Sequence, residues 1–369
     1  MERALLGEKV GKVNSKQINE IVGKVKDFIQ NGTLYNEEFG ELALELYDLH
    51  REMNPIYKKY DKGALKDWRE IPLMPIGEFK NGRVGIQWET EMPYPGVLFN
   101  SSGTTGRDKS EHFMYDTETY RASIARGFGF TIGDYGPPKY RMICLTPELK
   151  NSSLYYMMQY LSELYDPSGE FERFDGMTNA IRVRDFVEDL SWQVEPVILF
   201  GTSLAFYDLM ETIRSLDLES IKLPKNSLVM ETGGWKGRNI EVTPQELTRR
   251  VGNFFGVKKD DLIREYSMSE LSSQLYAWGN ESEVRYHAPE WLNYRLVDPL
   301  SQTEVQQGES GIIAFVDLAN VWSCPFILTE DVGHIYTGSK FMESLVLEGR
   351  AVNAPEKGCS LTYAQSMDR

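Results

Sequence analysis

Residues 98–113 read LFNSSGTTGRDKSEHF and crowd hydroxyl side chains, glycines and a lysine into one short segment. Gly103 and Gly106 carry no Cβ atom, so the backbone there can approach an anion closely. Hydroxyls donate hydrogen bonds, and Lys109 adds a mobile positive charge. The spacing is neither that of a Walker A loop nor that of a GxGxxG loop. The composition still favours a loop that holds the phosphates of ATP over a plain surface turn. Its expected phosphate ligands are Ser101, Ser102, Gly103, Thr104, Thr105, Gly106 and Lys109.

Short apolar runs dominate the middle of the chain. They occupy residues 141–147, 196–203, 227–235 and 311–318, and longer segments with helical spacing separate them. This alternation indicates an α/β fold with a partly parallel sheet flanked by helices. In such sheets ligands bind beyond the carboxyl ends of the strands. We therefore expect a site near the run endings LTP, FGTS and ETGG.

Helices are predicted from apolar spacing and from end signals. Residues 35–53 repeat apolar side chains at intervals of three and four, and Pro55 follows them. Thr243 can cap a helix that contains Glu246 three residues later and ends before Gly256. The Tyr-, Met- and Leu-rich stretch at 149–165 also has helical spacing, and we expect it to be core rather than the wall of an acyl tunnel.

The composition limits the possible partners. The chain of 369 residues has a formal net charge of −15, which disfavours nucleic acid and anionic membrane surfaces. Cys144, Cys324 and Cys359 are too few and too scattered for a disulfide framework or a zinc site. The histidines lack metal-ligand spacing, although His112 follows the phosphate loop closely enough to line its site. Without a signal peptide or a membrane-spanning run, a soluble cytoplasmic protein is expected.

The loop sequence SSGTTGRDK is similar to the phosphate-loop motif of the adenylate-forming superfamily of acyl-CoA synthetases, adenylation domains and firefly-type luciferases. Four further segments follow in the order of that superfamily: METGGWKG at 230–237, EYSMSE at 265–270, LTEDVG at 328–333 and EGRA at 348–351. Several matches in one fixed order are more specific than any single match. The resemblance implies an α/β fold like the N-terminal domain of these enzymes, with mixed and parallel sheets flanked by helices and a truncated C-terminal arm.

The departures from the superfamily pattern narrow the family. Ser267 and Ser269 replace a glycine and a threonine, and Glu330 replaces a glycine. About twenty residues follow Arg350, where the superfamily carries a C-terminal domain of roughly a hundred residues with a lysine for adenylation. The GGWK loop, the tail EKGCSLT (356–362) and the N-terminal stretch from NPIYKKY to IPLMPIGEFK resemble the LuxE-type acyl-protein synthetase of the bacterial bioluminescence fatty-acid reductase complex.

This resemblance implies an activity and a set of residue roles. A fatty acid reacts with ATP to form an acyl-adenylate, the acyl group moves to Cys359, and a partner acyl reductase then receives it. Capture by a thiol keeps the acyl group activated, and the nearby Lys357 favours the reactive thiolate.

Lys109 and Glu270 join Cys359 as the catalytic residues that the resemblance implies. The implied nucleotide contacts are Tyr266 on adenine, Gly233 and Gly234 along adenine or the acyl group, Ser269 at the α phosphate, Glu270 on Mg²⁺, Asp331 on ribose, and Arg350 near ribose or phosphate.

The chain is expected to divide into three parts. Residues 1–80 form a helical segment packed on the main domain, residues 81–347 form the ATP-binding domain, and residues 348–369 form a short mobile arm that carries Cys359. The last part has too little apolar content for an independent domain.

The sequence leaves two other functions open. One is a small ligase that passes acyl or aryl groups to coenzyme A, as phenylacetate–CoA ligases do. The short C-terminus and the KGC tail speak against it. The other is a non-catalytic nucleotide-binding scaffold on a decayed synthetase fold. The retention of Lys109, Glu270, Asp331 and Cys359 together speaks against that reading.

Overall fold

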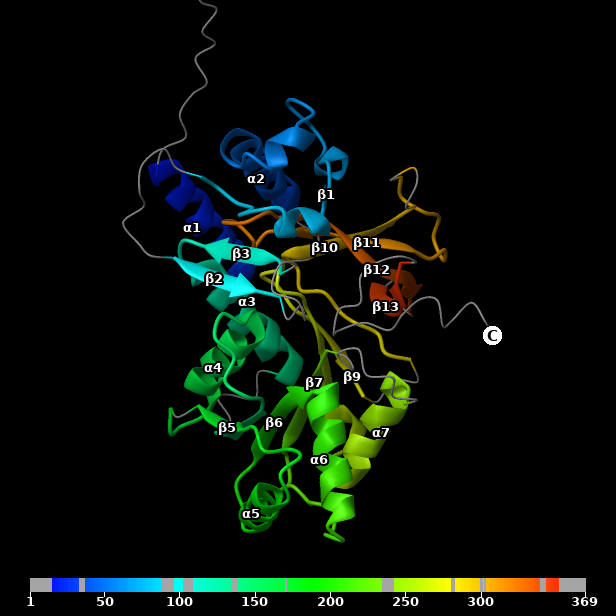
Figure 1. Cartoon of the computed structure of the whole chain (residues 1–369). Helices are drawn as coiled ribbons and strands as arrows, with labels where there is room; N and C mark the ends of the chain where they lie inside the picture. The colour runs from blue at the N-terminus through cyan, green and yellow to red at the C-terminus, as the bar shows by residue number, and fades with distance from the viewer. Residues whose placement is uncertain are drawn as a thin grey trace, which may run out of the picture.

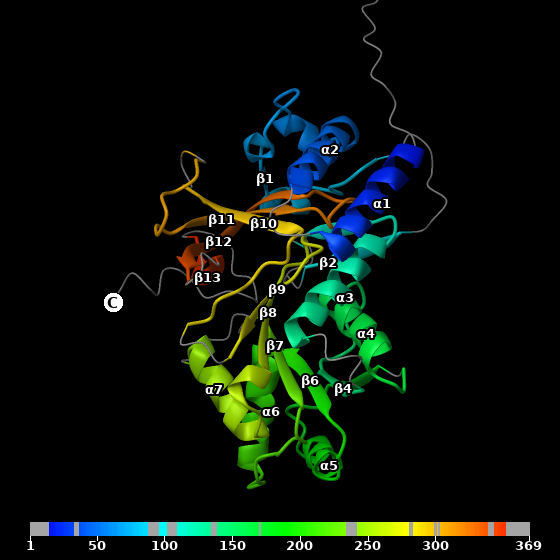
Figure 2. The ribbon, with the colours of Figure 1, turned by 180° about the vertical axis from the view of Figure 1, so that it is seen from behind.

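The computed structural model describes residues 15–32, 37–87, 96–101, 109–133, 139–169, 171–233, 242–279, 283–298, 301, 303–338 and 343–351. Two large sheets organise this part of the chain, one above the other in Figure 1. The N-terminal helices α1 (Ser15–Asn31) and α2 (Glu37–Met53) lie at the upper end. The view from behind shows α1 beside α3 (Glu118–Ile132), which it contacts (Figure 2).

The lower sheet is mainly parallel. Its strand order is β5 (Glu172–Phe174), β4 (Arg141–Leu145), β6 (Val197–Thr202), β7 (Leu228–Thr232), β8 (Leu262–Tyr266) and β9 (Leu275–Trp278). Neighbours are parallel except for β9, which runs antiparallel to β8. The strands β4, β6 and β7 lie within the apolar runs at 141–147, 196–203 and 227–235, so this part of the strand prediction is confirmed.

Helices cover both faces of the lower sheet, which explains why its strands are continuous apolar runs. Met142 and Cys144 of β4 pack in one core with α3 and α4 (Ser153–Tyr165). Ile143 and Leu145 point to the opposite face and pack with α5 (Ala180–Ser191), α6 (Ser203–Ser215) and α7 (Pro244–Phe255). Buried side chains of α4 belong to the first core, as expected for 149–165.

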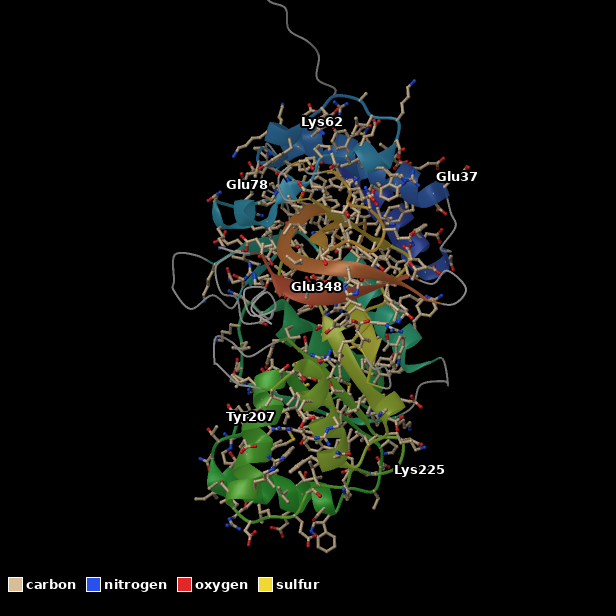
Figure 3. The ribbon with its side chains drawn as sticks, turned by 90° about the vertical axis from the view of Figure 1, so that its right-hand side faces the viewer. Glu37, Lys62, Glu78, Tyr207, Lys225 and Glu348 are labelled. Carbon is tan, nitrogen blue, oxygen red and sulfur yellow. The ribbon has the colours of Figure 1, made fainter. Side chains whose placement is uncertain are left out.

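The upper sheet is mostly antiparallel. It contains β10 (Leu292–Val297), β11 (Gly311–Asp317), β12 (Phe326–Thr337) and β13 (Glu343–Arg350), and the short β1 (Met74–Pro75) runs parallel to β12. The apolar run at 311–318 was expected in the α/β sheet, and it forms β11 here instead. In the described residues no helix connects β10, β11 and β12, so these strands pair as antiparallel neighbours. Figure 3 shows Glu348 of β13 at mid-height, between Glu37 of α2 and Tyr207 of α6.

Smaller elements complete the described part of the fold. The hairpin of β2 (Val97–Asn100) and β3 (Glu111–Met114) leads into α3. The 3₁₀ turns are η1 (Tyr57–Tyr60), η2 (Trp68–Glu70), η3 (Ile76–Lys80) and η4 (Lys259–Asp261). One apolar core runs from α1 and α2 through the hairpin to the α3 face of the lower sheet.

The predicted ends of α7 are confirmed. The Thr243 hydroxyl accepts a hydrogen bond of 3.2 Å from the Glu246 N–H, and Gly256 closes the helix in the left-handed conformation at φ 66°. The Glu246 carboxylate pairs with Arg249 and Arg250 on the next turn.

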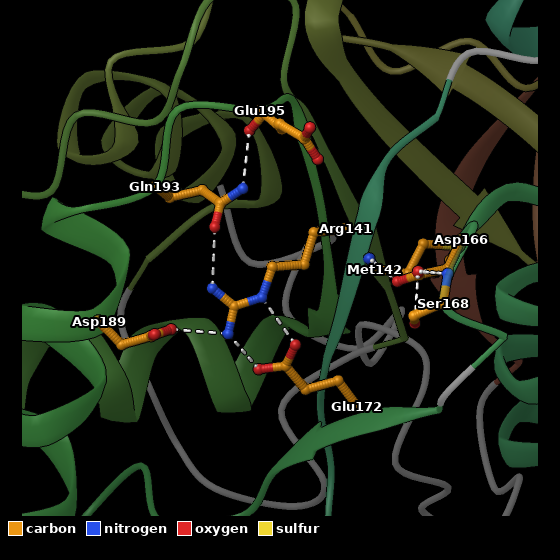
Figure 4. Close-up of polar contacts among 8 residues, drawn as sticks. All are labelled: Arg141, Met142, Asp166, Ser168, Glu172, Asp189, Gln193 and Glu195. Carbon is orange, nitrogen blue, oxygen red and sulfur yellow. Dashed lines mark hydrogen bonds and ion pairs between the residues drawn. The ribbon is translucent and has the colours of Figure 1, made fainter.

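Polar contacts fix the amino-terminal edge of the lower sheet (Figure 4). Arg141 donates to both carboxylate oxygens of Glu172 at 2.8 and 2.7 Å and forms an ion pair of 2.7 Å with Asp189. Asp166 accepts the N–H of Met142 at 2.9 Å. These contacts tie β4 to β5 and α5, which leaves the opposite, carboxyl edge for the candidate site.

Candidate active site

The expected phosphate loop joins the two strands of the β2–β3 hairpin. At its neck, Ser101 N–H donates to the Ser110 carbonyl at 3.1 Å, and Ser110 N–H donates to the Ser101 hydroxyl at 2.9 Å. The loop therefore begins and ends at the same place, where Ser101 and Ser110 are hydrogen-bonded to each other. Lys109 is exposed at this neck. The remaining predicted ligands of the loop lie outside the described residues: Ser102, Gly103, Thr104, Thr105 and Gly106.

A glycine follows β7 at the carboxyl edge of the lower sheet. Gly233 has φ 71°, a conformation that side chains with a Cβ atom rarely adopt. Its carbonyl accepts the Ser203 hydroxyl at 2.9 Å, which ties the strand end to the start of α6. Gly234 lies outside the described residues. The structure thus gives a backbone reason for the glycine at 233, while its contact with a ligand stays a prediction.

Three predicted site residues from separate segments meet directly. The Tyr266 hydroxyl at the end of β8 donates to Asp331 Oδ2 at 2.7 Å. Arg350 Nε of β13 lies 3.6 Å from Asp331 Oδ1, and Asp331 and Arg350 are register partners in β12 and β13. Arg350 also pairs with Glu330 and is 4% exposed. The motif segments 265–270, 328–333 and 348–351 therefore converge at the carboxyl end of β8.

The ring of Tyr266 packs among other aromatic rings. Its centroid lies 5.7 Å from that of Tyr286 and 6.3 Å from that of Phe315, and the residue is 5% exposed. Stacking of adenine on this ring stays a prediction.

Ser269 and Glu270 follow β8 in a turn, and Glu270 is 1% exposed. Behind them lies His112 of β3, which is fully buried. His112 Nδ1 lies 2.6 Å from the Ser269 carbonyl oxygen, and Nε2 lies 3.0 Å from Asn320 Oδ1. Both contacts are satisfied together only when both ring nitrogens carry hydrogen. Burial lowers the pKa of His112, whereas its bond to Ser269 and the charge of Glu270 oppose that shift.

A buried carboxyl group lies next to Tyr266 in the chain. Glu265 of β8 is register partner of Thr232 in β7 and of Tyr276 in β9, and it accepts a hydrogen bond from the Thr232 hydroxyl. Burial raises the pKa of Glu265 to about 6, and the bonds to Ser267 and Thr232 oppose the shift. Burial also raises the pKa of Asp317 to about 6. Neither group was identified from the sequence, because Glu265 lies next to Arg264 in a segment with charged residues and Asp317 stands at the end of an apolar run, where a polar residue is ordinary.

Glu265→Gln is expected to change stability in a pH-dependent way. The pKa of Glu265 is about 6 in the folded chain against 4.5 for the free side chain, so the unfolded state loses its proton at lower pH. The Glu265 contribution to stability therefore falls by about 2 kcal/mol between pH 4 and pH 8. The variant lacks this loss, so its stability relative to the wild type rises over the same range. Urea unfolding at each pH measures the difference in stability between the variant and the wild type. Asp317→Asn should change this difference with pH in the same direction. A difference that does not depend on pH would contradict the prediction.

Two of the three cysteines are poor nucleophiles. Cys144 and Cys324 are fully buried. Burial raises the pKa of the Cys324 thiol to about 12 and raises that of Cys144 further. Because the thiolate is the reactive form, both fit the inert structural role expected for them. Cys359 lies outside the described residues.

Other features of the described residues lie apart from this convergence. A pocket of about 400 Å³ borders Trp68, Arg295 and Glu309 and includes none of the predicted site residues. No group of three or more His, Cys, Asp or Glu residues among those described could hold a metal ion. No described helix is long and apolar enough to cross a membrane.

The architecture matches solved structures of ligases. A 2-hydroxyisobutyryl-CoA ligase in the postadenylation state superposes with a TM-score of 0.59 at 13% identity, over 91% of this chain and 68% of that chain. The same ligase in the thioesterification state gives a TM-score of 0.60 at 14% identity, over 96% and 72%. The fold is that of an adenylate-forming ligase. This confirms the fold predicted from the sequence.

The family follows from the sequence comparison. Residues 45–368 match the model of the family described as acyl-protein synthetase, LuxE, and the chain belongs to this family of ligases. A long-chain-fatty-acid–luciferin-component ligase of Aliivibrio fischeri is 23% identical over 97% of this chain and 96% of its own length. The ligase of that name from Vibrio harveyi is 21% identical over 87% and 85%. The family predicted from the sequence is confirmed.

Proposed function

We propose that this chain activates a long-chain fatty acid with ATP and carries the acyl group on Cys359 before a partner acyl reductase receives it. A fatty carboxylate oxygen attacks the α phosphorus of ATP, and pyrophosphate leaves. The Cys359 thiolate then attacks the acyl carbon, AMP leaves, and a thioester forms. A thiol of the partner takes the acyl group by exchange and returns Cys359 as a thiol. Family membership and the names of the relatives support this proposal.

The observation that carries the proposal is the meeting of Tyr266, Asp331 and Arg350 at the carboxyl end of β8. Asp331 offers carboxylate oxygens that can accept the two ribose hydroxyls of ATP. A phosphate chain requires local positive charge in a chain whose net charge is −15. The exposed Lys109 supplies such a charge, and Arg350 offsets part of the negative charge of Glu330 and Asp331.

The remaining roles concern the phosphates and the metal. The loop over 101–109 would hold the β and γ phosphates, and Ser269 would contact the α phosphate. Glu270 supplies the carboxylate oxygen that Mg²⁺ prefers. When bound, Mg²⁺ would offset the negative charge of the phosphates. We also propose the division into residues 1–80, 81–347 and 348–369 that the sequence suggested. In this division the last part carries Cys359 to the acyl-adenylate.

Asp331→Asn is expected to lower kcat/KM for ATP by about 10- to 100-fold, because a hydrogen bond to a charged group contributes about 1.5–3 kcal/mol. Fatty-acid-dependent exchange of pyrophosphate into ATP measures this step. Tyr266→Phe is the matched control: it removes the hydroxyl that Asp331 accepts and keeps the ring, and we expect a change of less than about fivefold.

The outcomes separate the open functions. An Asp331→Asn enzyme within twofold of the wild type would contradict the ribose role. Steady AMP release only when coenzyme A is added would favour the coenzyme A ligase. A wild type with no fatty-acid-dependent exchange would favour the scaffold.

A further inference from the structure

The Ser269–Glu270 segment is held by buried side chains from two other parts of the chain. The carbonyl of Ser269 contacts His112 Nδ1 at 2.6 Å. The carbonyl of Glu270 accepts Asn320 Nδ2 at 2.9 Å. His112 is 0% exposed and Asn320 is 1% exposed, so both side chains that make these contacts are shielded from water. The peptide carbonyls of Ser269 and Glu270 are therefore both held by buried side chains.

The orientation of the Asn320 amide is determined by its partners. Its Nδ2 donates to two carbonyls, those of Glu270 at 2.9 Å and Cys324 at 2.8 Å. Its Oδ1 must then face His112 Nε2, 3.0 Å away. A reversed amide would place the oxygen against two carbonyl oxygens. His112, Asn320 and the two carbonyls thus form one connected set, which we call the His112–Asn320 clamp.

A third buried group extends the same support. Asp317 accepts the Ser272 N–H at 2.8 Å and the Ser273 hydroxyl at 2.6 Å. The chain from Ser269 to Ser273 is therefore tied to the end of β11 and the turn that follows it.

The position of His112 links this segment to the phosphate loop. His112 lies two residues after Ser110, which closes the neck of the loop, and it pairs with Phe99 across the hairpin. A shift of the hairpin would move His112 and with it the Ser269 carbonyl.

Resting on the function proposed above, we propose that His112 is a positioning residue that couples the β2–β3 hairpin to Ser269 and Glu270 through the His112–Asn320 clamp. Adenylate formation needs the phosphates and the metal ligand in one geometry, and a displacement of about 1 Å can cost about 100-fold in rate. The clamp would hold the β2–β3 hairpin and the Ser269–Glu270 segment in one fixed arrangement.

A purely structural role is the competing explanation, because His112 also packs edge-on against Phe79 and Phe99. A matched pair of substitutions separates the two. His112→Asn keeps a donor near the Nδ1 position and can still reach the Ser269 carbonyl. His112→Gln keeps a donor near the Nε2 position and loses that contact.

The chain offers a control with similar surroundings. His50 is also fully buried, its Nε2 lies 3.0 Å from the Val321 carbonyl, and its Nδ1 contacts Asn54 at 3.2 Å. It touches the same turn as Asn320 without contacting the Ser269–Glu270 segment. His50→Asn and His50→Gln therefore report the cost of altering a buried histidine in this core.

The experiment measures fatty-acid-dependent pyrophosphate exchange over a range of Mg²⁺ concentrations, together with Tm, for all four variants. We expect His112→Gln to lower kcat by about tenfold or more and to raise the Mg²⁺ concentration for half-maximal rate, with KM for the fatty acid unchanged. His112→Asn should stay within about threefold. The His50 variants should lower Tm and leave the Mg²⁺ dependence unchanged.

Equal kinetic effects of His112→Asn and His112→Gln, or effects confined to Tm, would overturn the positioning role. If His112→Gln yields no folded protein, Asn320→Ala removes the bond to the Glu270 carbonyl without changing His112. Asn320→Ala keeps the His112 ring but also removes the partner of its Nε2 and the bond to the Cys324 carbonyl. It should show the same fall in kcat and the same Mg²⁺ shift, and normal Mg²⁺ dependence would overturn the clamp. A wild type without exchange would instead overturn the proposed function and this inference with it.

Discussion

Cys359→Ser is expected to abolish the acylated form of the protein while leaving fatty-acid-dependent pyrophosphate exchange within about twofold of the wild type. The hydroxyl of serine is a far weaker nucleophile than a thiolate at neutral pH, so the acyl-adenylate would form and find no acceptor. The residues proposed for adenylate formation lie in other segments of the chain, and the substitution does not change them.

The intact mass of the protein after incubation with Mg²⁺, ATP and a labelled fatty acid shows whether an acyl group has been attached. The wild type should gain the mass of one acyl group, and neutral hydroxylamine should remove it, because hydroxylamine cleaves thioesters. Cys144→Ala is the matched control. Cys144 is fully buried, and burial raises the pKa of its thiol, so its removal should leave the acyl mass in place.

Two results would contradict the carrier role of Cys359. A Cys359→Ser protein that still gains an acyl mass removable by neutral hydroxylamine would place the acyl group on another cysteine. A wild type that gains none, yet consumes coenzyme A during turnover, would make the cysteine a bystander.

The sequence predicted the parts of this protein that depend on local patterns. The apolar runs became β4, β6 and β7 because strands covered on both faces contain few polar residues. The ends of α7 were readable because capping involves residues that are neighbours in the chain. The order of the motif segments led to the family, and Tyr266, Asp331 and Arg350 do converge.

Contacts between distant side chains were not readable. His112 and Asn320 are 208 positions apart, and nothing near either residue indicates the other. The run at 311–318 has the composition of a buried strand, but composition does not say which sheet a strand joins. Glu265 stands beside the predicted Tyr266, and its carboxyl group is buried because β8 lies between β7 and β9, where Glu265 pairs with Thr232 and Tyr276.

Arg350→Met is expected to destabilise the fold by about 2–3 kcal/mol. Arg350 is the buried cation beside two neighbouring carboxylates of β12, Glu330 and Asp331. Removal of one partner from a buried ion pair costs about 3–5 kcal/mol. The side chains of Glu330 and Asp331 are 29% and 14% exposed, so water recovers part of that loss. Urea unfolding at pH 7 measures the change.

A second substitution tests whether charge is the cause. In Arg350→Met/Glu330→Gln one carboxylate is neutral, so part of the lost stability should return. Arg214→Met is the matched surface control: its ion pair with Glu211 is about half exposed, and we expect a cost below about 1 kcal/mol. A cost below about 1 kcal/mol for Arg350→Met, or no recovery in the double variant, would contradict the electrostatic explanation.

The same variant shows whether Arg350 serves the nucleotide as well as the fold. A ligand that binds only the folded state raises stability according to its concentration and affinity. ATP should therefore raise the unfolding midpoint of the wild type and of Arg214→Met alike. If Arg350 contacts ribose or phosphate, or holds Asp331 in place for ribose, Arg350→Met should lose most of this increase. An undiminished increase would restrict Arg350 to balancing the charges of Glu330 and Asp331, and Asp331 would then bind ribose without its help.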